Sequence, residues 1–239
     1  MRIGVAGVTG RVGLMLVEVL GTSFAGGIGR GGDLAGLAAR CDVVIDFTHA
    51  DAVAGHAAVL TEAGIGWVLG TTGLTAADEA AVAAAAQRIG VVFAANFSPG
   101  VALVIALAER MAAALPAADY DAEILEMHHR QKVDAPSGTA LAIGRAVAAG
   151  RGVDLAAVRA SGRDGQTGER RTGDIGFAAL RGGQVVGDHS LIFAGAAERI
   201  TISHEAFDRM VFARGAMRAA LWLQGKAPGL YGMADILGL

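Results

Sequence analysis

Short apolar runs alternate with amphipathic segments up to about residue 98. A continuous apolar run predicts a buried strand, and apolar residues spaced three and four apart predict a helix. The expected strands are Ile3–Ala6, a weaker one at 23–30, 42–47, Gly66–Leu69 and 91–94. The expected helices are Arg11–Leu20, Ala50–Ala63 and about 74–89, the last with Thr75 as a cap. Strands and helices in this alternation predict a parallel sheet with right-handed crossovers.

The rhythm changes after residue 98. The later elements are expected to be a helix at about 100–114, a strand at 123–127, a helix at 137–149, an antiparallel meander over 174–204 and a final helix from Phe207 to Leu221. The polar, glycine-rich stretch 159–173 is long enough to predict a functional loop. We therefore expect an α/β domain followed by an α+β domain that contains an open antiparallel or mixed sheet.

Composition and charge exclude several classes of protein. Of 239 residues, 53% are hydrophobic, but charges such as Glu109 and Arg110 interrupt every apolar stretch before it reaches the length of a membrane span. The net charge of −3, from 20 basic and 23 acidic residues, does not favour nucleic acid as a partner. A single cysteine, Cys41, and a strand pattern that begins directly after Met1 lead us to expect a cytoplasmic protein.

Three glycines separate the first expected strand from the first expected helix. Gly7, Gly10 and Gly13 follow the spacing G-x-x-G-x-x-G. Glycine lets backbone N–H groups approach a pyrophosphate at the positive end of a helix. A tight turn without a ligand is the alternative, but the position between strand and helix favours dinucleotide binding.

The end of the second expected strand bears on the choice of cofactor. An NAD site usually has an acidic residue there to hold the ribose 2′-hydroxyl. Here no carboxylate precedes Arg30, which lies where a 2′-phosphate would be bound. This favours NADPH over NADH, although Asp33 as a ribose ligand and Arg30 as a solvated surface charge both stay open.

A second group of polar residues lies between 126 and 139. His128 and His129 follow an expected strand, Lys132 comes shortly after, and Ser137-Gly138-Thr139 follows Pro136 at the start of an expected helix. Adjacent histidines at a strand end point to opposite faces, so the pair would chelate a metal poorly and no metal site is expected. Helix N–H groups beside cationic side chains suit a small carboxylate with a proton donor nearby. The alternative is a helix cap with solvated surface charges.

The other potentially reactive side chains stand alone in the sequence. His49, His56, His189 and His204 are expected to be structural or on the surface. Cys41 is expected to be a small buried side chain.

The stretch 126–140, which reads EMHHRQKVDAPSGTA, resembles the signature of the dihydrodipicolinate (4-hydroxy-tetrahydrodipicolinate) reductase family of the diaminopimelate–lysine pathway. The resemblance covers almost the whole chain. It extends to the glycine turn, Asp46-Phe47-Thr48, Gly70-Thr71-Thr72-Gly73, Ala94-Ala95-Asn96-Phe97-Ser98 and 165–170, which reads GQTGER.

The resemblance implies a Rossmann-type dinucleotide-binding domain at 1–98 plus 209–239, and a substrate-binding and oligomerisation domain at 99–208. It implies His128 as the acid–base residue and Lys132 as a proton donor, with substrate carboxylates bound by His129, Ser137, Gly138 and Thr139. The cofactor contacts that it implies are Gly7, Val8, Thr9, Gly10, Arg11, Val12, Gly70, Thr71, Thr72, Ala94, Ala95, Asn96 and Phe97. Family members commonly form homotetramers through the antiparallel sheet.

The chain departs from the family between Gly13 and Asp46, where it is shorter, and at Gly29, which replaces an acidic residue that binds the adenosine ribose. The implied reaction is NAD(P)H-dependent reduction of 4-hydroxy-tetrahydrodipicolinate, a small dicarboxylate, to tetrahydrodipicolinate. The alternatives are a reductase of another small imino or keto acid, similar to aspartate dehydrogenase, and a non-catalytic NAD(P)-binding sensor.

Overall fold

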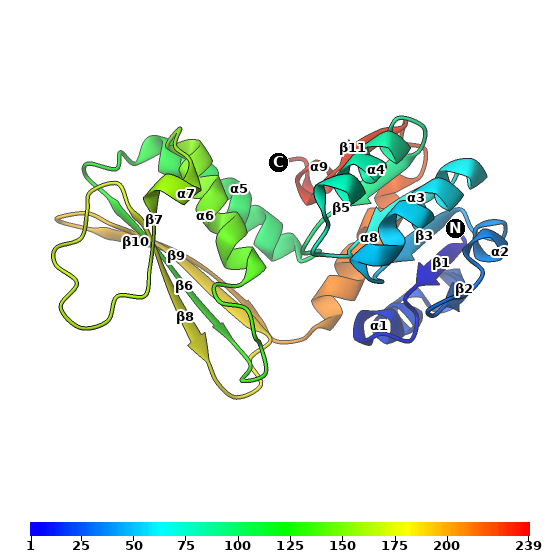
Figure 1. Ribbon diagram of the computed structural model, residues 1–239, viewed down its shortest axis with the longest axis horizontal. Helices are drawn as coiled ribbons and strands as arrows, with labels where there is room; N and C mark the ends of the chain where they lie inside the picture. Colours follow the sequence, from blue (N-terminus) through cyan, green and yellow to red (C-terminus); the bar gives the residue numbers. More distant parts are fainter. The chain divides into compact units, whose positions relative to one another are not determined.

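A computed structural model describes all residues from 1 to 239. The chain forms two compact units, one made of Met1–Pro99 with Arg209–Leu239 and the other of Gly100–Asp208. Figure 1 shows the elements of each unit, coloured along the sequence. The second unit is therefore inserted between two parts of the first.

The first unit is built on a six-stranded parallel sheet with the strand order β11-β5-β4-β3-β1-β2. Its strands are β1 (Ile3–Ala6), β2 (Phe24–Ile28), β3 (Val43–Asp46), β4 (Gly66–Leu69), β5 (Gly90–Phe93) and β11 (Gly229–Tyr231). Every residue of β1 and β3 is buried. Helices cover both faces of a parallel sheet, which explains why these strands are apolar apart from Asp46 at the end of β3.

Two layers of helices cover this sheet. They are α1 (Arg11–Leu20), α2 (Leu34–Ala38), α3 (Ala50–Ala63), α4 (Ala76–Ala86), α8 (Met210–Leu223) and α9 (Met233–Leu237), with a short 3-10 turn at Gly21–Ser23. α1 packs on α8, whereas α3 packs on α2 and α4 (Figure 1). The main core lies between the sheet and the layer of α2 to α4, around Leu37, Val53, Leu60 and Trp67.

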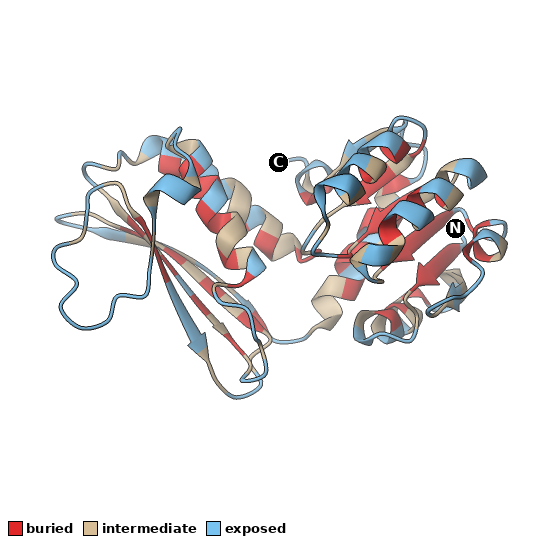
Figure 2. Cartoon of the chain, viewed as in Figure 1, coloured by how far each residue is buried: buried red, intermediate tan, exposed pale blue.

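The second unit is built on a five-stranded mixed sheet with the strand order β10-β9-β6-β8-β7. Its elements are α5 (Pro99–Ala114), β6 (Asp121–His128), α6 (Gly138–Gly150), α7 (Leu155–Val158), β7 (Arg159–Ser161), β8 (Ile175–Arg181), β9 (Gly187–Ala194) and β10 (Arg199–Ala206). Alternate residues of β6 and β9 are buried, because helices cover only one face of this sheet. Figure 2 shows the buried residues along these strands and on the inner sides of the helices.

The expected antiparallel meander over 174–204 is wrong for its first strand. β9 and β10 are antiparallel neighbours, but β8 pairs in parallel with β6 and β7. The link from β8 to β9 instead passes the carboxyl end of β6, where Gly182 donates to the His128 carbonyl at 3.0 Å and His129 donates to the Val185 carbonyl at 2.8 Å. The side chains that a strand buries do not reveal whether its neighbour runs parallel or antiparallel, so the local sequence does not identify the partner of β8.

The helix from Met210 is also not the final element, because β11 and α9 follow it. β11 adds a strand to the edge of the first sheet beside β5. None of the helices has both the length and the apolar character that a membrane span requires.

Candidate active site

The glycine turn after β1 is too tightly packed for larger side chains. Gly7 has φ of +85°, which favours glycine, and a Cβ there would overlap the Phe47 carbonyl. A Cβ at Gly13 would overlap the Gly7 carbonyl oxygen. Gly10 precedes α1 and provides no side-chain cap for the helix. Thr9, Gly10 and Arg11 are exposed, so the backbone at the α1 N-terminus is open to close approach, which fits a pyrophosphate group.

The other expected cofactor residues follow strands of the same parallel sheet and so lie at its carboxyl edge. Gly70 donates to the Asp46 carbonyl at 2.8 Å, and Ala94 donates to the Leu69 carbonyl at 3.2 Å. The rings of Phe47 and Phe97 lie 5.6 Å apart. The structure thus brings the segments 70–72 and 94–97 together beside the segment 46–48.

Asp46 organises this edge, a role that the sequence did not reveal. Its buried carboxylate accepts hydrogen bonds from Thr48 Oγ1 at 2.6 Å, His56 Nδ1 at 2.7 Å and Trp67 Nε1 at 3.3 Å. The amide of Thr48 also donates to Thr71 Oγ1 at 3.1 Å. The available signal was an acidic residue at the end of an otherwise apolar strand.

The segment after β2 lies beside the glycine turn. The amides of Gly7 and Val8 both donate to the Ile28 carbonyl, and Arg30 follows as an exposed residue. Asp33 caps α2 by accepting a hydrogen bond from the Gly36 amide at 2.9 Å. The Asp33 carboxylate is therefore engaged in capping α2, whereas the Arg30 side chain is exposed to solvent.

The second unit holds a buried carboxylate at the end of β6. Glu126 accepts hydrogen bonds from His128 Nδ1 at 2.6 Å and from the Ser137 amide at 3.0 Å. The guanidinium of Arg181, on β8, donates to both carboxylate oxygens at 2.7 and 2.8 Å. A bidentate arrangement of this kind is among the stronger ion pairs in proteins. The β6–β8 register places Arg181 beside His128.

These contacts shift the pKa values of both partners. Burial alone would raise the pKa of Glu126, but the hydrogen bonds from Arg181, His128 and Ser137 outweigh it and hold that pKa below its usual range. Burial lowers the pKa of His128, while the Glu126 carboxylate opposes that shift. Glu126 is thus an anion, and His128 releases a proton more readily than an exposed histidine.

Lys132 and His129 lie in the loop that follows β6. Lys132 Nζ forms an ion pair with Asp134 at 2.8 Å, and Arg181 donates to the Asp134 carbonyl at 2.6 Å. His129 Nδ1 is buried and forms no hydrogen bond within the protein. His128, His129 and Lys132 are therefore grouped at the carboxyl end of β6, and Arg181 links Glu126 to the Asp134 backbone.

Ser137 begins α6 and joins a second histidine to the site. Its Oγ accepts from the Ala140 amide at 3.2 Å and lies 3.0 Å from His189 Nε2. Gly138, next in the chain, is exposed, and a Cβ there would meet no atom within 4 Å. The α6 N-terminus is therefore accessible at Gly138 to an anionic group.

The structure gives His189 a place in the site that the sequence did not reveal. Burial lowers the pKa of His189 to about 4, and its ring meets that of His128 edge to face at 5.1 Å. His204 lies beyond it at 6.5 Å, and burial lowers its pKa too. The available signal was the alternation of β9 and β10, which places His189 and His204 on the face covered by the helices. No group of three or more metal-ligating side chains is arranged to hold a metal ion.

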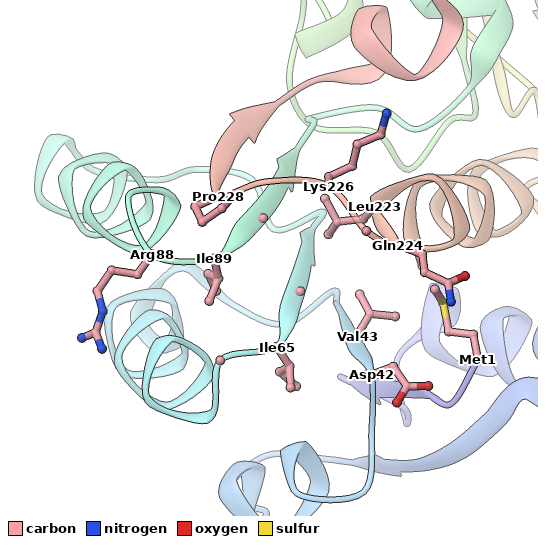
Figure 3. A pocket seen from close by; sticks show the side chains of 15 residues that line it. Met1, Asp42, Val43, Ile65, Arg88, Ile89, Leu223, Gln224, Lys226 and Pro228 are labelled. Carbon is pink, nitrogen blue, oxygen red and sulfur yellow. The ribbon is translucent and has the colours of Figure 1, made fainter.

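A pocket of about 330 Å³ lies elsewhere in the first unit, at the amino ends of β3, β4 and β5 (Figure 3). Val43, Gly66 and Leu223 are among the residues that line it. In Figure 3 the charged groups of Arg88 and Lys226 point outward. None of the expected site residues lines this pocket, which lies at the sheet edge opposite the glycine turn.

The parallel sheet with its glycine turn and the separate histidine–lysine cluster define an oxidoreductase with a nicotinamide cofactor. Models of the dihydrodipicolinate reductase N-terminus and C-terminus match residues 21–97 and 100–237. The chain belongs to this family.

Individual relatives agree with this assignment. Proteins named 4-hydroxy-tetrahydrodipicolinate reductase from Acidiphilium cryptum and Gluconacetobacter diazotrophicus are 67% and 61% identical to it. In each case the match covers 100% of this chain and 98% of the relative. A solved structure of dipicolinate-bound dihydrodipicolinate reductase from Paenisporosarcina sp. TG-14 has a TM-score of 0.76 and 24% identity, covering 99% of both chains. This last match supports the fold.

Proposed function

We propose that this chain reduces 4-hydroxy-tetrahydrodipicolinate to tetrahydrodipicolinate, with loss of water, in the diaminopimelate–lysine pathway. The observation that carries the proposal is the cluster of His128, His129 and Lys132 beside the accessible N-terminus of α6. The named relatives, which match the whole chain, carry out the reaction that their name describes. A buried, unpaired Cys41 agrees with a location in the reducing cytoplasm.

The first unit would hold NADPH or NADH, which supplies the hydride. Its glycine turn, from Gly7 to Val12, would cradle the pyrophosphate through backbone N–H groups. The segments 70–72 and 94–97 at the same sheet edge would hold the nicotinamide end. Asp46 would keep the first of these segments in place through Thr48 and Thr71.

The second unit would bind the two substrate carboxylates. We assign this role to His129, Ser137, Gly138 and Thr139, with the helix dipole of α6 and the charge of Lys132 in support. A mildly acidic protein gains a local attraction for a dianion from such a cluster.

His128 and Lys132 would complete the reaction by delivering a proton. Negative charge develops on the conjugated system of the substrate as hydride is added at carbon four, and a proton must neutralise it. The lowered pKa of His128 makes its protonated form a stronger acid than free imidazole.

Replacing Lys132 by Ala tests this assignment. We expect kcat to fall about 100-fold or more, because a positioned proton donor contributes at least this much. The Kd of NADPH, measured by fluorescence titration, should stay within about twofold of wild type. Loss of a proton donor slows the chemical step but does not weaken cofactor binding.

Lys226→Ala is the matched control, because it removes a lysine outside the expected site. Lys226 lies in the first unit, over the ring of Trp222. An equal loss of NADPH affinity in Lys132→Ala would contradict the proton-donor role. If NADPH binds but is not oxidised with freshly generated substrate, a non-catalytic sensor is supported instead. Turnover of a different small imino or keto acid would support a reductase similar to aspartate dehydrogenase.

We propose NADPH as the preferred cofactor, because the exposed Arg30 follows the carboxyl end of β2 and the nearby Asp33 is engaged as a helix cap. Arg30→Ala should weaken NADPH binding about tenfold, the value of one charge-assisted hydrogen bond, and leave NADH binding unchanged. Arg88→Ala, at the opposite edge of the sheet, is the control. Paired titrations give the Kd values of NADH and NADPH for each variant. An unchanged ratio of these Kd values in Arg30→Ala would exclude Arg30 as a ligand of the 2′-phosphate.

We further propose a homotetramer that assembles through the sheet of the second unit. Helices cover one face of this sheet, while Leu125 and Leu180 lie exposed on the other. An apolar patch that no helix covers is typical of an interface between subunits.

A further inference from the structure

Glu126 and Arg181 contact the expected catalytic histidine but are not themselves among the expected site residues. We propose that Glu126, held by Arg181, is a positioning residue that fixes His128 in its Nδ1–H tautomer and directs Nε2 to the substrate. The proposed tautomer follows from the hydrogen bonds and the ion pair of Glu126. Only its consequence for turnover rests on the proposed function.

The partners of Glu126 dictate where the His128 proton lies. One carboxylate oxygen accepts from the Ser137 amide and from Arg181, and the other accepts from Arg181 and contacts His128 Nδ1. An amide and a guanidinium can only donate, and the bidentate pair with the positively charged guanidinium keeps the carboxylate ionised. An ionised carboxylate only accepts, and therefore His128 Nδ1 carries the proton.

The other ring nitrogen of His128 is placed differently. Nε2 forms no hydrogen bond within the protein, and it faces Gly187 at the start of β9. A Cβ at Gly187 would lie only 3.0 Å from Nε2, so glycine keeps this side of the ring open. With Nδ1–H bound to Glu126, Nε2 is the atom that can gain and release a proton.

The surrounding charges support this division of roles. Glu126 stabilises the imidazolium form of His128, while the positive charges of Lys132 and Arg181 oppose it. His189, which meets the His128 ring from β9, has a pKa of about 4 and adds no charge near neutral pH. The imidazolium can thus give up its Nε2 proton and keep Nδ1–H on Glu126.

Arg181 also connects His128 to the loop that bears Lys132. The same guanidinium that holds Glu126 donates to the Asp134 carbonyl at 2.6 Å, and Asp134 is the ion-pair partner of Lys132. Arg181 therefore holds Glu126, which contacts His128, and also Asp134, which pairs with Lys132. This explains why an arginine, with its planar fork of donors, suits this position.

The test is nitrogen-15 NMR of histidine-labelled protein at pH 8 without substrate, with His128→Gln used to assign the signal. In the wild type we expect a protonated Nδ1 and an unprotonated Nε2 for His128. In Glu126→Gln we expect the Nε2–H form to grow and the pKa of His128 to fall, because the carboxylate that favours the imidazolium is gone. Glu123→Gln is the matched control: this residue lies on the same strand but pairs with Arg163 and Arg170.

A wild-type His128 in the Nε2–H form, or an unchanged tautomer in folded Glu126→Gln, would overturn the proposal. Kinetics add a second readout that a general loss of folding would not produce. Glu126→Gln should lower kcat about tenfold or more and move the alkaline limb of the pH–rate profile to lower pH, because His128 must be protonated to donate, with the KM for NADPH unchanged.

Gly187→Ala serves if Glu126→Gln does not fold. This variant keeps Glu126 and places a methyl group beside Nε2, so we expect the Nδ1–H signal to persist while kcat falls about tenfold. Wild-type kcat in Gly187→Ala would overturn the assignment of Nε2. The NMR result does not depend on the identity of the substrate, so the tautomer can fail or stand separately from the proposed reaction.

Discussion

His189 shows how burial turns a titratable side chain into a neutral structural one. The residue is 3% exposed, and its Nε2 lies 3.0 Å from Ser137 Oγ, at the start of α6. The folded protein therefore holds this imidazole uncharged, with a pKa of about 4, while the unfolded chain binds a proton near pH 6.5. Below the unfolded pKa, the unfolded state takes up more protons than the folded state.

This difference predicts a loss of stability on mild acidification. Because the unfolded state binds more protons, the free energy of unfolding should fall by about 2 kcal/mol between pH 7 and pH 5 through His189 alone. His128 and His204, whose pKa values are also lowered, act in the same direction. Urea unfolding followed across this pH range measures the slope.

The variant His189→Gln should reduce that slope, because glutamine does not titrate. The control is His49→Asn, since His49 is exposed at the start of α3 and makes no capping hydrogen bond. If His189→Gln retained the wild-type slope, its neutral state in the folded protein would be refuted.

The residues of the site differ in how far the sequence could reveal them. His128, His129, Lys132 and the segment 137–139 are close in sequence, so their types and spacing indicated an anion site directly. Arg181 and His189 are distant in sequence and reach the cluster only through the sheet register, which pairs Arg181 with His128 and His189 with Glu126. The pattern within a strand indicates which of its side chains face the core. It does not say which distant strand lies beside it.

The elements were predictable where their apolar pattern was long enough. β1, α1, α3 and β4 have the expected bounds. β11 and α2 were not expected, because a three-residue strand and a five-residue helix contain too few positions to show a period. The partner of β8 was not predictable either, since β9 takes the other edge of β6 and leaves β8 to pair in parallel.

The polar segment after β7 is fixed mainly by one arginine. Arg170 donates to the carboxylates of Asp121 and Glu123, and to the carbonyls of Ala122 and Asp174. We expect Arg170→Ala to lower the free energy of unfolding of the second unit by about 2–3 kcal/mol, because several acceptors lose a charged donor together. Hydrogen exchange of β6 amides and proteolysis within 162–173 would both increase.

Arg163→Ala provides the comparison, because Arg163 also pairs with Glu123 but is 44% exposed against 19% for Arg170. An exposed pair of this kind contributes about 0.5 kcal/mol. Equal effects of the two variants would show that Arg170 is not the anchor of this segment.

The molecule as a whole is organised around an insertion. α8 packs on α1, and β11 pairs with β5, so the first unit needs both parts of the chain that flank the second unit. The first ninety-nine residues by themselves would leave β5 at the sheet edge and one side of α1 uncovered. The glycine turn therefore sits in a unit that is complete only when the end of the chain has folded onto its beginning.

Assembly of several copies would use the second unit, in which one sheet face lacks helices. Met127 and Leu180 are register partners on β6 and β8, and Leu125 lies on the same side of β6 as Met127. At the Glu123 end of this face, Arg163 and Arg170 approach from the polar segment and leave the apolar part uncovered. An apolar centre with a charged rim is the usual anatomy of a stable interface.

A charge placed in this apolar centre should separate the copies. Leu180 is 49% exposed, so Leu180→Arg should change the free energy of unfolding of the single chain little. A homotetramer, however, would have to bury the new guanidinium without a partner. Light scattering coupled to size-exclusion chromatography should show a tetramer for the wild type and a smaller species for Leu180→Arg. Leu230→Arg, on β11 of the first unit and 52% exposed, should remain tetrameric. If Leu180→Arg stayed tetrameric as well, the subunits would have to meet through another surface, because no sheet face could bury a row of unpaired charges.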